Sequence, residues 1–79
     1  PILSLTINLR TVESEIAESL SRVQDKNKDV EIGSYPFFRA GKLGVSLVLR
    51  STSQNKIDIC NSEILNFVKH KKIEIVEEN

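Results

Sequence analysis

The spacing of the apolar residues changes repeatedly along this chain, and no other sequence feature constrains the fold as strongly. Four apolar residues near the start alternate with polar ones: Leu3, Leu5, Ile7 and Leu9. This period of two predicts a strand with one buried face. The next apolar residues recur every three or four positions: Val12, Ile16, Ala17, Leu20 and Val23. That spacing predicts an amphipathic helix that begins at an N-cap, Thr11, and ends within residues 25–28.

The rest of the chain repeats this change of period. Three further strands are expected: residues 30–38, 45–50 and 73–76. The segment 33–36 interrupts the first of these. A hairpin turn is predicted at residues 42–43, between two glycines, Gly41 and Gly44. Before the last strand, the apolar stripe of a second helix is formed by Ile57, Cys60, Ile64, Phe67 and Val68.

The predicted order is strand, helix, strand, strand, helix, strand, which is the ferredoxin-like βαββαβ arrangement of the α+β class. We therefore expect a four-stranded antiparallel sheet with two helices on one face, and with the first and third strands at its centre. The helical stripes and one sheet face would form one core, so residues 1–79 are expected to be a single small domain. The chain begins with Pro1 and not with Met, so we expect a subdomain of a larger protein.

Charge and cysteine content exclude several kinds of protein. Lys plus Arg number 11 and Asp plus Glu number 11, whereas a dedicated nucleic-acid binder carries a basic excess. No run approaches the ~18 apolar residues that a membrane span needs. The single cysteine, Cys60, cannot form an internal disulfide, and it cannot complete a zinc site with the single histidine, His70. We therefore expect no bound metal, and a cytoplasmic protein in which Cys60 is a small core residue.

The segment from Gly33 to Pro36 carries the most specific local information. Gly33 permits backbone conformations and close contacts that other residues do not, and Pro36 removes an N–H, which suits a strand edge or a bulge. One interpretation is a bulged strand that anchors Tyr35 in a small core. The other interpretation is a kink that presents Ser34 and Tyr35 to a neighbouring domain or a ligand.

Three stretches of the chain resemble one family. They are Glu13-x-Glu15-Ile16-Ala17-x-x-Leu20, Val30-x-Ile32-Gly33-Ser34-Tyr35-Pro36 and Val45-x-Leu47-x-Leu49-Arg50-Ser51. Together they are similar to the C-terminal subdomain of molybdopterin-binding-like proteins of the competence-damage-inducible type, as found in the N-terminal module of eukaryotic FAD synthases. The resemblance covers nearly the whole chain. The chain departs from the family at residues 52–55, where an Asp is common, and in a second helix without the usual alanines.

The resemblance implies an accessory subdomain that packs on the nucleotide-binding core of a larger enzyme, an FAD synthase or a nucleotide pyrophosphatase. FAD, FMN or an ADP-ribose-like nucleotide would bind to that parent, and this piece would hold no cofactor of its own. Its partners would be the rest of the parent chain and a second copy in a homodimer. Gly33, Ser34, Tyr35 and Pro36 carry over as the family motif, whereas no catalytic residue carries over.

Other interpretations stay open. The run Gly41-Lys42-Leu43-Gly44 matches the Gly-x-x-Gly pattern of KH domains, so Gly41, Lys42 and Gly44 are a candidate phosphate-contact loop. The KH loop joins two helices, however, and residues 45–50 lack the stacking aromatics of an RRM, so nucleic-acid binding is disfavoured. A ferredoxin-like regulatory or dimerisation module that binds a small ligand also fits the pattern. An independent enzyme is least favoured, because Ser34 has no evident base partner.

Overall fold

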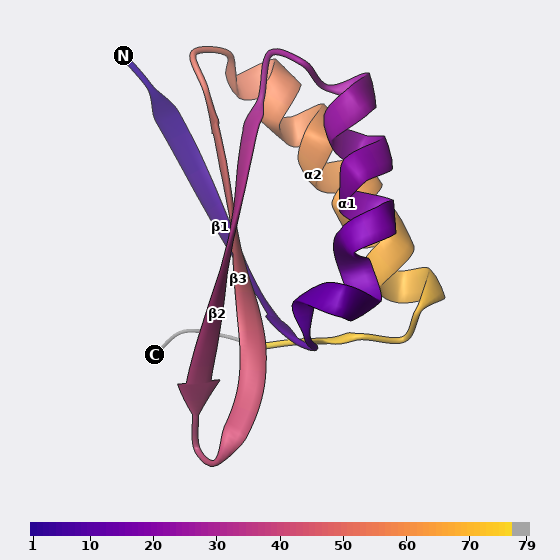
Figure 1. Ribbon diagram of the computed structural model, residues 1–79. Coiled ribbons are helices and arrows are strands. Elements are labelled where there is room, and N and C mark those ends of the chain that lie inside the picture. The colour runs from indigo at the N-terminus through magenta and orange to yellow at the C-terminus, as the bar shows by residue number, and fades with distance from the viewer. Residues whose placement is uncertain (77–79) are drawn as a thin grey trace.

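The computed structural model describes residues 1–76, which form two helices and four strands. They are β1 (Leu3–Arg10), α1 (Glu13–Lys26), β2 (Glu31–Arg39), β3 (Lys42–Ser51), α2 (Gln54–His70) and β4 (Glu74–Ile75). The strands form one antiparallel sheet in the order β2-β3-β1-β4, and both helices cover the same face of it (Figure 1). The predicted α+β, ferredoxin-like arrangement is confirmed, including the central position of the first and third strands.

One core lies between the sheet and the helices. Its buried residues are Ile7, Leu9, Ile16, Val23, Val30, Val45, Leu47, Leu49, Ile57, Cys60, Ile64 and Val68. This set confirms the alternation predicted for β1 and β3, the stripe of α2 and the core position of Cys60. Two residues assigned to the stripe of α1 are exposed instead, because Val12 precedes the helix and Ala17 lies outside its contact with the core.

The predicted interruption of the second strand is wrong. β2 runs through Gly33–Pro36, and its pairing with β3 keeps one register from Glu31 opposite Arg50 to Arg39 opposite Lys42, without a bulge. The physical reason is that β2 lies at the edge of the sheet. A proline there can point its missing N–H away from the neighbouring strand, so no ladder hydrogen bond is lost.

The predicted position of the hairpin turn is also wrong. The turn consists of Ala40 and Gly41, whose φ angles are 56° and 74°, whereas Lys42 and Gly44 belong to β3. Positive φ at both central residues is typical of a two-residue type I′ turn, whose twist matches that of the flanking strands. This turn places Phe37 opposite Gly44.

The two helices begin differently. At α1 the N-cap is Val12 and not the predicted Thr11, and no side chain caps the helix. The first turn of the helix closes on Val12, whose carbonyl accepts a hydrogen bond from the Glu15 N–H. The helix therefore starts one residue later than expected. At α2 the Ser53 hydroxyl accepts a hydrogen bond from the Lys56 N–H at 3.3 Å, which is a standard serine cap.

Within residues 1–76, β4 pairs with β1 at Leu9 and Arg10, and the Val76 N–H adds one bond to the Asn8 carbonyl at 2.8 Å. Within residues 1–76, no helix is long and apolar enough to cross a membrane.

Candidate functional site

The motif Gly33–Pro36 places its side chains on both faces of β2, because neighbouring residues in a strand point in opposite directions. On the inner face, the Ser34 hydroxyl donates to Glu13 Oε1 at 2.7 Å, which fastens the strand to the start of α1. On the outer face, Tyr35 is 52% exposed. Its ring lies over Gly33, where a Cβ would come within 2.7 Å of the Tyr35 Oη. Tyr35 is therefore not a core residue, and Ser34 and Tyr35 do not converge on one site.

Gln24 and Pro36 protect the free edge of β2. Gln24 Oε1 accepts from the Ile32 N–H at 3.2 Å, and Gln24 Nε2 donates to the Val30 carbonyl at 2.7 Å. The backbone of Ile32 therefore faces away from β3. By strand alternation the backbones of Ser34 and Pro36 face the same way, and Pro36 presents no N–H there. Glutamine and proline together leave this edge with few free donors.

An aromatic–arginine cluster lies on the outer face at the hairpin end of the sheet. The Phe37 ring occupies the space above Gly44, and the guanidinium carbons of Arg39 and Arg10 lie 5.0 and 5.8 Å from its centroid. Arg10 Nη1 also donates to the Lys42 and Leu43 carbonyls at 3.3 and 3.4 Å. Cation–π contacts of this length stabilise the two arginines beside the ring. The two arginines place positive charge together at this end of the sheet, although the net charge of the whole chain is zero.

Sequence reasoning did not pick out Arg10, Arg39 or Phe37 as site residues. The period of two does place Phe37 and Arg39 on one face of β2. The position of Arg10 depends on the register between β1 and β3, which a single sequence does not contain.

The candidate phosphate-contact loop does not form one loop. Gly41 lies in the turn and has open space around it, whereas Gly44 lies within β3 beneath the Phe37 ring. Lys42 is exposed at the first position of β3. Of the three residues, Lys42 alone offers an accessible donor on the side chain.

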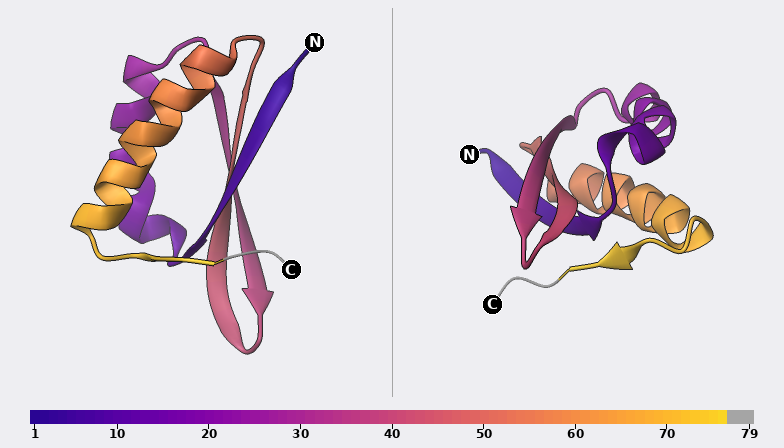
Figure 2. Two further views of the ribbon diagram at one scale, coloured as in Figure 1. Left: turned by 180° about the vertical axis from the view of Figure 1, so that it is seen from behind. Right: turned by 60° about the horizontal axis from the view of Figure 1, so that its bottom comes forward.

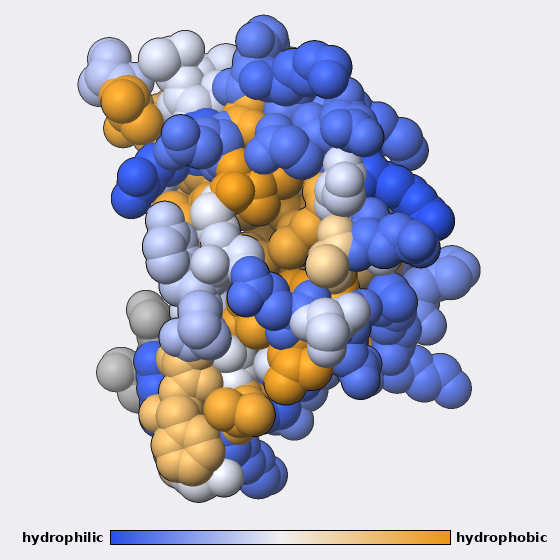
Figure 3. Space-filling view, in the orientation of Figure 1, coloured by the Kyte–Doolittle hydropathy of each residue, from blue (hydrophilic) through white to orange (hydrophobic). Residues whose placement is uncertain are grey.

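An apolar tip, formed by Pro36, Phe38 and Leu43, lies on the inner side of the hairpin. Phe38 and Leu43 face each other across β2 and β3 and are 69% and 56% exposed. Figure 1 shows that this end of the hairpin extends past the helices, and Figure 3 shows hydrophobic side chains gathered there. The inner sheet face therefore continues beyond the layer that covers it.

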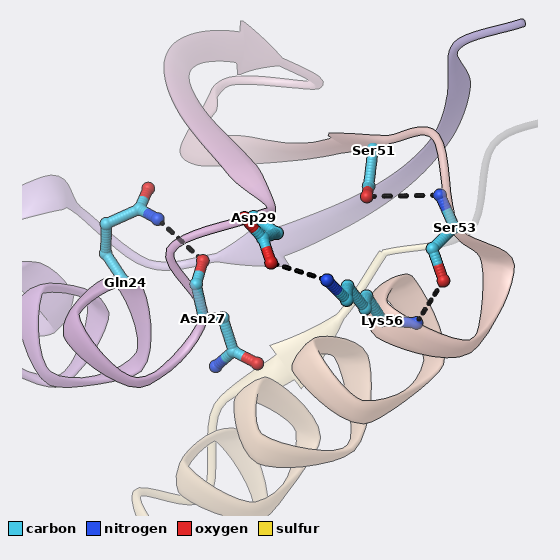
Figure 4. Close-up of polar contacts among 6 residues, drawn as sticks. All are labelled: Gln24, Asn27, Asp29, Ser51, Ser53 and Lys56. Carbon is cyan, nitrogen blue, oxygen red and sulfur yellow. Dashed lines mark hydrogen bonds and ion pairs between the residues drawn. The ribbon is translucent and has the colours of Figure 1, made fainter.

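Two titratable side chains near α2, Asp29 and Cys60, have shifted pKa values. Asp29 and Lys56 form an exposed ion pair (Figure 4), and the hydrogen bond and charge of Lys56 lower the pKa of the Asp29 carboxyl. Burial raises the pKa of the Cys60 thiol to about 11, with a smaller contribution from Glu63. A thiol with a raised pKa is a poor nucleophile. Within residues 1–76, no three His, Cys, Asp or Glu side chains group as metal ligands.

A groove of about 520 Å³ lies between the two helices. Its lining residues are Ser19, Arg22, Val23, Lys26, Ser62, Glu63, Asn66 and Phe67. Glu63 is engaged by a hydrogen bond from Asn27 Nδ2 at 3.0 Å, and Arg22 by Glu18 at 2.9 Å. Of the charged groups that line this groove, Arg22 and Glu63 are therefore already engaged within the chain.

These features define a ferredoxin-like α+β domain whose candidate functional parts are exposed surfaces. The family model described as FAD synthase, middle domain, matches residues 1–77. The chain belongs to this family. The resemblance to an FAD synthase module is therefore confirmed, while the assignment to the molybdopterin-binding-like and competence-damage-inducible group stays a prediction. A search of curated proteins gives no significant match.

Solved structures support the fold. The de novo designed protein Foldit4 is similar with a TM-score of 0.71 and 19% identity, over 100% of both chains. The intact alpha subunit of aIF2 from Pyrococcus abyssi is similar with a TM-score of 0.57 and 19% identity, over 100% of this chain and 35% of that chain. At this level of identity the likeness concerns the fold alone.

Proposed function

We propose that this chain is an accessory, non-catalytic domain of FAD synthase that packs through its apolar tip against a neighbouring domain of the same parent protein. The observation that carries this proposal is the exposure of Phe38 and Leu43 side by side at the end of the hairpin. The family description, which calls this part of FAD synthase a middle domain, is consistent with neighbours on both sides.

The physical argument rests on the cost of exposed apolar surface. Burying a large apolar side chain that would otherwise face water stabilises a contact by about 1.5–3 kcal/mol. Adjacent aromatic and leucine side chains at a projecting tip are suited to fill a pocket on a partner. The neighbour that we propose is the nucleotide-binding core of the parent, of the molybdopterin-binding-like type.

The test uses a full-length FAD synthase that contains this chain. The double substitution Phe38→Ser and Leu43→Ser should increase protease cleavage between the domains and lower the rate of FAD formation. The matched control is Ile59→Ser, which removes a side chain that is 47% exposed on α2. If the double variant behaved like the control in both measurements, the proposal would be wrong.

A second candidate function is contact with the phosphates of a nucleotide in the parent, such as FAD, FMN or an ADP-ribose-like molecule. It is favoured by the aromatic–arginine cluster with Lys42 beside it, because guanidinium groups suit phosphate. The exposed Tyr35 ring on the same face of β2 also favours it, because exposed rings suit stacking. An NMR titration with FAD, ADP-ribose and a short single-stranded RNA would test it. Shifts at Tyr35, Phe37 and Arg39 with a nucleotide would support it, and shifts with RNA alone would indicate nucleic-acid binding instead.

A further inference from the structure

Two aromatic rings on the outer face of the sheet lean over glycines. The Tyr35 ring lies over Gly33, two residues before it on β2. The Phe37 ring lies over Gly44, its partner on β3. Because glycine has no side chain, each ring can turn one side to the backbone and its other side to the solvent. Tyr35 is exposed and Phe37 is half-buried, so the Tyr35 ring offers the larger surface for stacking.

Positive charge lies next to the second of these rings. Arg39 follows Phe37 by two residues on β2, and Lys42 pairs with Arg39 across the hairpin, so these side chains share the outer face. Arg39 and Lys42 are both exposed. A third cation, Arg10, reaches this end of the sheet from β1, and its hydrogen bonds to carbonyls of β3 fix its guanidinium group. Guanidinium and ammonium groups are the usual protein partners of phosphate.

The exposed ring and the cations lie a short distance apart. Tyr35 and Arg39 are separated by four positions on β2, which corresponds to ~13 Å at about 3.3 Å per residue. The Arg39 side chain folds back over Phe37, with its guanidinium carbon 5.0 Å from the ring centroid. A heterocycle, a sugar and a diphosphate joined in a row extend over a comparable distance. One small ligand can therefore reach the ring and the cations together.

The distribution of charge favours a small ligand over a nucleic-acid strand. The net charge of the chain is zero, whereas a long polyanion binds through many cations. At the other end of the outer face, Glu31 lies opposite Arg50, and both are exposed. A nucleic-acid strand that continued along the sheet would meet this carboxylate, whereas a ligand with one diphosphate needs only the cations at the hairpin.

We propose that the outer face of the β2–β3 hairpin binds a planar heterocycle joined through a sugar to a diphosphate, the chemistry that ADP and FAD share. The heterocycle stacks on Tyr35, and the diphosphate lies at Arg39 and Lys42. Phe37 contacts both arginines and Arg10 binds the hairpin backbone, so these two are positioning residues. The ligand lies on β2 and β3, whereas β4 forms the opposite edge of the sheet. This inference rests on the second candidate function above and adds the class of the ligand and its orientation.

The experiment titrates this chain with four probes: ADP, FAD, adenosine and inorganic pyrophosphate. In NMR spectra, ADP and FAD should shift the backbone amides of Tyr35, Arg39 and Lys42. Adenosine and pyrophosphate each carry one part of the recognised chemistry, so their dissociation constants should be about tenfold higher or more. The chain contains one tyrosine and no tryptophan, so its intrinsic fluorescence reports on Tyr35. ADP should quench this fluorescence, and pyrophosphate should not.

Two substitutions separate the ring from the cations. Tyr35→Leu should raise the dissociation constant for ADP by about tenfold, because stacking is lost, and should leave the constant for pyrophosphate unchanged. Arg39→Gln should raise both constants, because both probes carry the diphosphate. The matched control is Arg50→Gln, which removes an exposed arginine from the other end of the same face and should change neither constant. The circular dichroism spectra of all variants should match that of the unmodified chain.

The titration also separates this proposal from the functions proposed above. The proposal would be overturned by an absence of these shifts with ADP at about 10 mM, or by a Tyr35→Leu variant that binds ADP as tightly as the unmodified chain. Pyrophosphate that binds as tightly as ADP would refute the ligand class and leave the phosphate contact standing. A short single-stranded RNA that binds more tightly than ADP would overturn the proposal as well. The apolar-tip variant Phe38→Ser with Leu43→Ser should bind ADP normally, so domain packing and nucleotide binding are measured separately.

Discussion

At the scale of single residues, the requirement for glycine at position 44 comes from Phe37, its neighbour across the hairpin. The Phe37 ring fills the space where a side chain at this position would lie, and a Cβ would come within 2.6 Å of Phe37 Cε1. Aromatic residues that cover a glycine in this way protect the exposed backbone and help to fix the register of the strands.

Gly44→Ala should therefore destabilise the domain by about 1–3 kcal/mol, because the ring must leave its place beside Arg10 and Arg39. Urea unfolding measures the loss. The same substitution in a Phe37→Ala background should cost much less, because the two changes are coupled. An equal cost in both backgrounds would contradict the explanation.

The buried thiol of Cys60 makes the stability of the core depend on pH. Its pKa is about 11 in the folded protein, against an ordinary value of 9.0, because burial disfavours the thiolate. The folded state therefore holds this proton more strongly than the unfolded state, so the associated stability is complete below pH 9 and is lost as the pH rises towards 11.

The shift corresponds to about 2–3 kcal/mol. In urea unfolding at several pH values, the free energy of unfolding should fall more steeply above pH 9 for the unmodified chain than for Cys60→Ala. Parallel pH profiles for the two proteins would show that the thiol does not contribute.

At the scale of elements, the start of α2 depends on one hydroxyl. Ser53→Ala removes the acceptor for the Lys56 N–H and should cost about 0.5–2 kcal/mol. Thr52→Ala is the matched control, since Thr52 is an exposed neighbour in the same loop. Ser53→Asp should restore the lost stability, whereas equal effects of Ser53→Ala and Thr52→Ala would refute the cap.

The side chain of Gln24, in α1, forms hydrogen bonds with the backbone at the edge of β2. Gln24→Leu would leave the Ile32 N–H and the Val30 carbonyl without their partner, at a cost of about 1–3 kcal/mol. Amide exchange at Ile32 should accelerate in Gln24→Leu. In Gln24→Glu it should accelerate less, because that side chain still provides an acceptor at the same position.

The type of each element could be predicted from the sequence, because hydrophobic period reports which face of a strand or helix is buried. The apolar residues that alternate from Leu3 to Leu9, and those of the stripe from Ile57 to Val68, are the ones that lie in the core or pack against it. The turn was misplaced because Gly41 and Gly44 are the same residue type with different roles, one providing a positive φ and the other providing space.

The candidate surfaces were harder to predict, because they depend on which strands lie side by side. Arg10 and Phe37 meet only because β1 and β2 both flank β3. Pro36 signalled a break in the strand, but at an edge it lies within a regular strand. The contact between Ser34 and Glu13 likewise joins residues that no local pattern connects.

At the scale of the whole molecule, stability and interaction reside in different parts of one apolar sheet face. Leu47 is fully buried and Phe38 is mostly exposed, although both lie on the inner side of the β2–β3 hairpin.

Leu47→Ala should cost about 2–5 kcal/mol, a large share of the 5–15 kcal/mol that is typical of domain stability. Phe38→Ser should cost less than about 1 kcal/mol in this chain. Thermal unfolding compares the two variants, and a large loss for Phe38→Ser would mean that the tip is part of the core.

The two-residue turn at Ala40 and Gly41 also bears on the order in which the chain assembles. It brings β2 and β3 together by closing a very short loop, whereas β1 must reach β3 across more than thirty residues, from Leu9 to Val45 at the nearest. Hairpins form within about 1–10 μs, and distant pairings are slower because more chain entropy is lost. We therefore expect the hairpin to form first and to act as the folding nucleus. In stopped-flow kinetics, changes in the turn should alter the folding rate, and changes where β4 meets β1 should alter the unfolding rate.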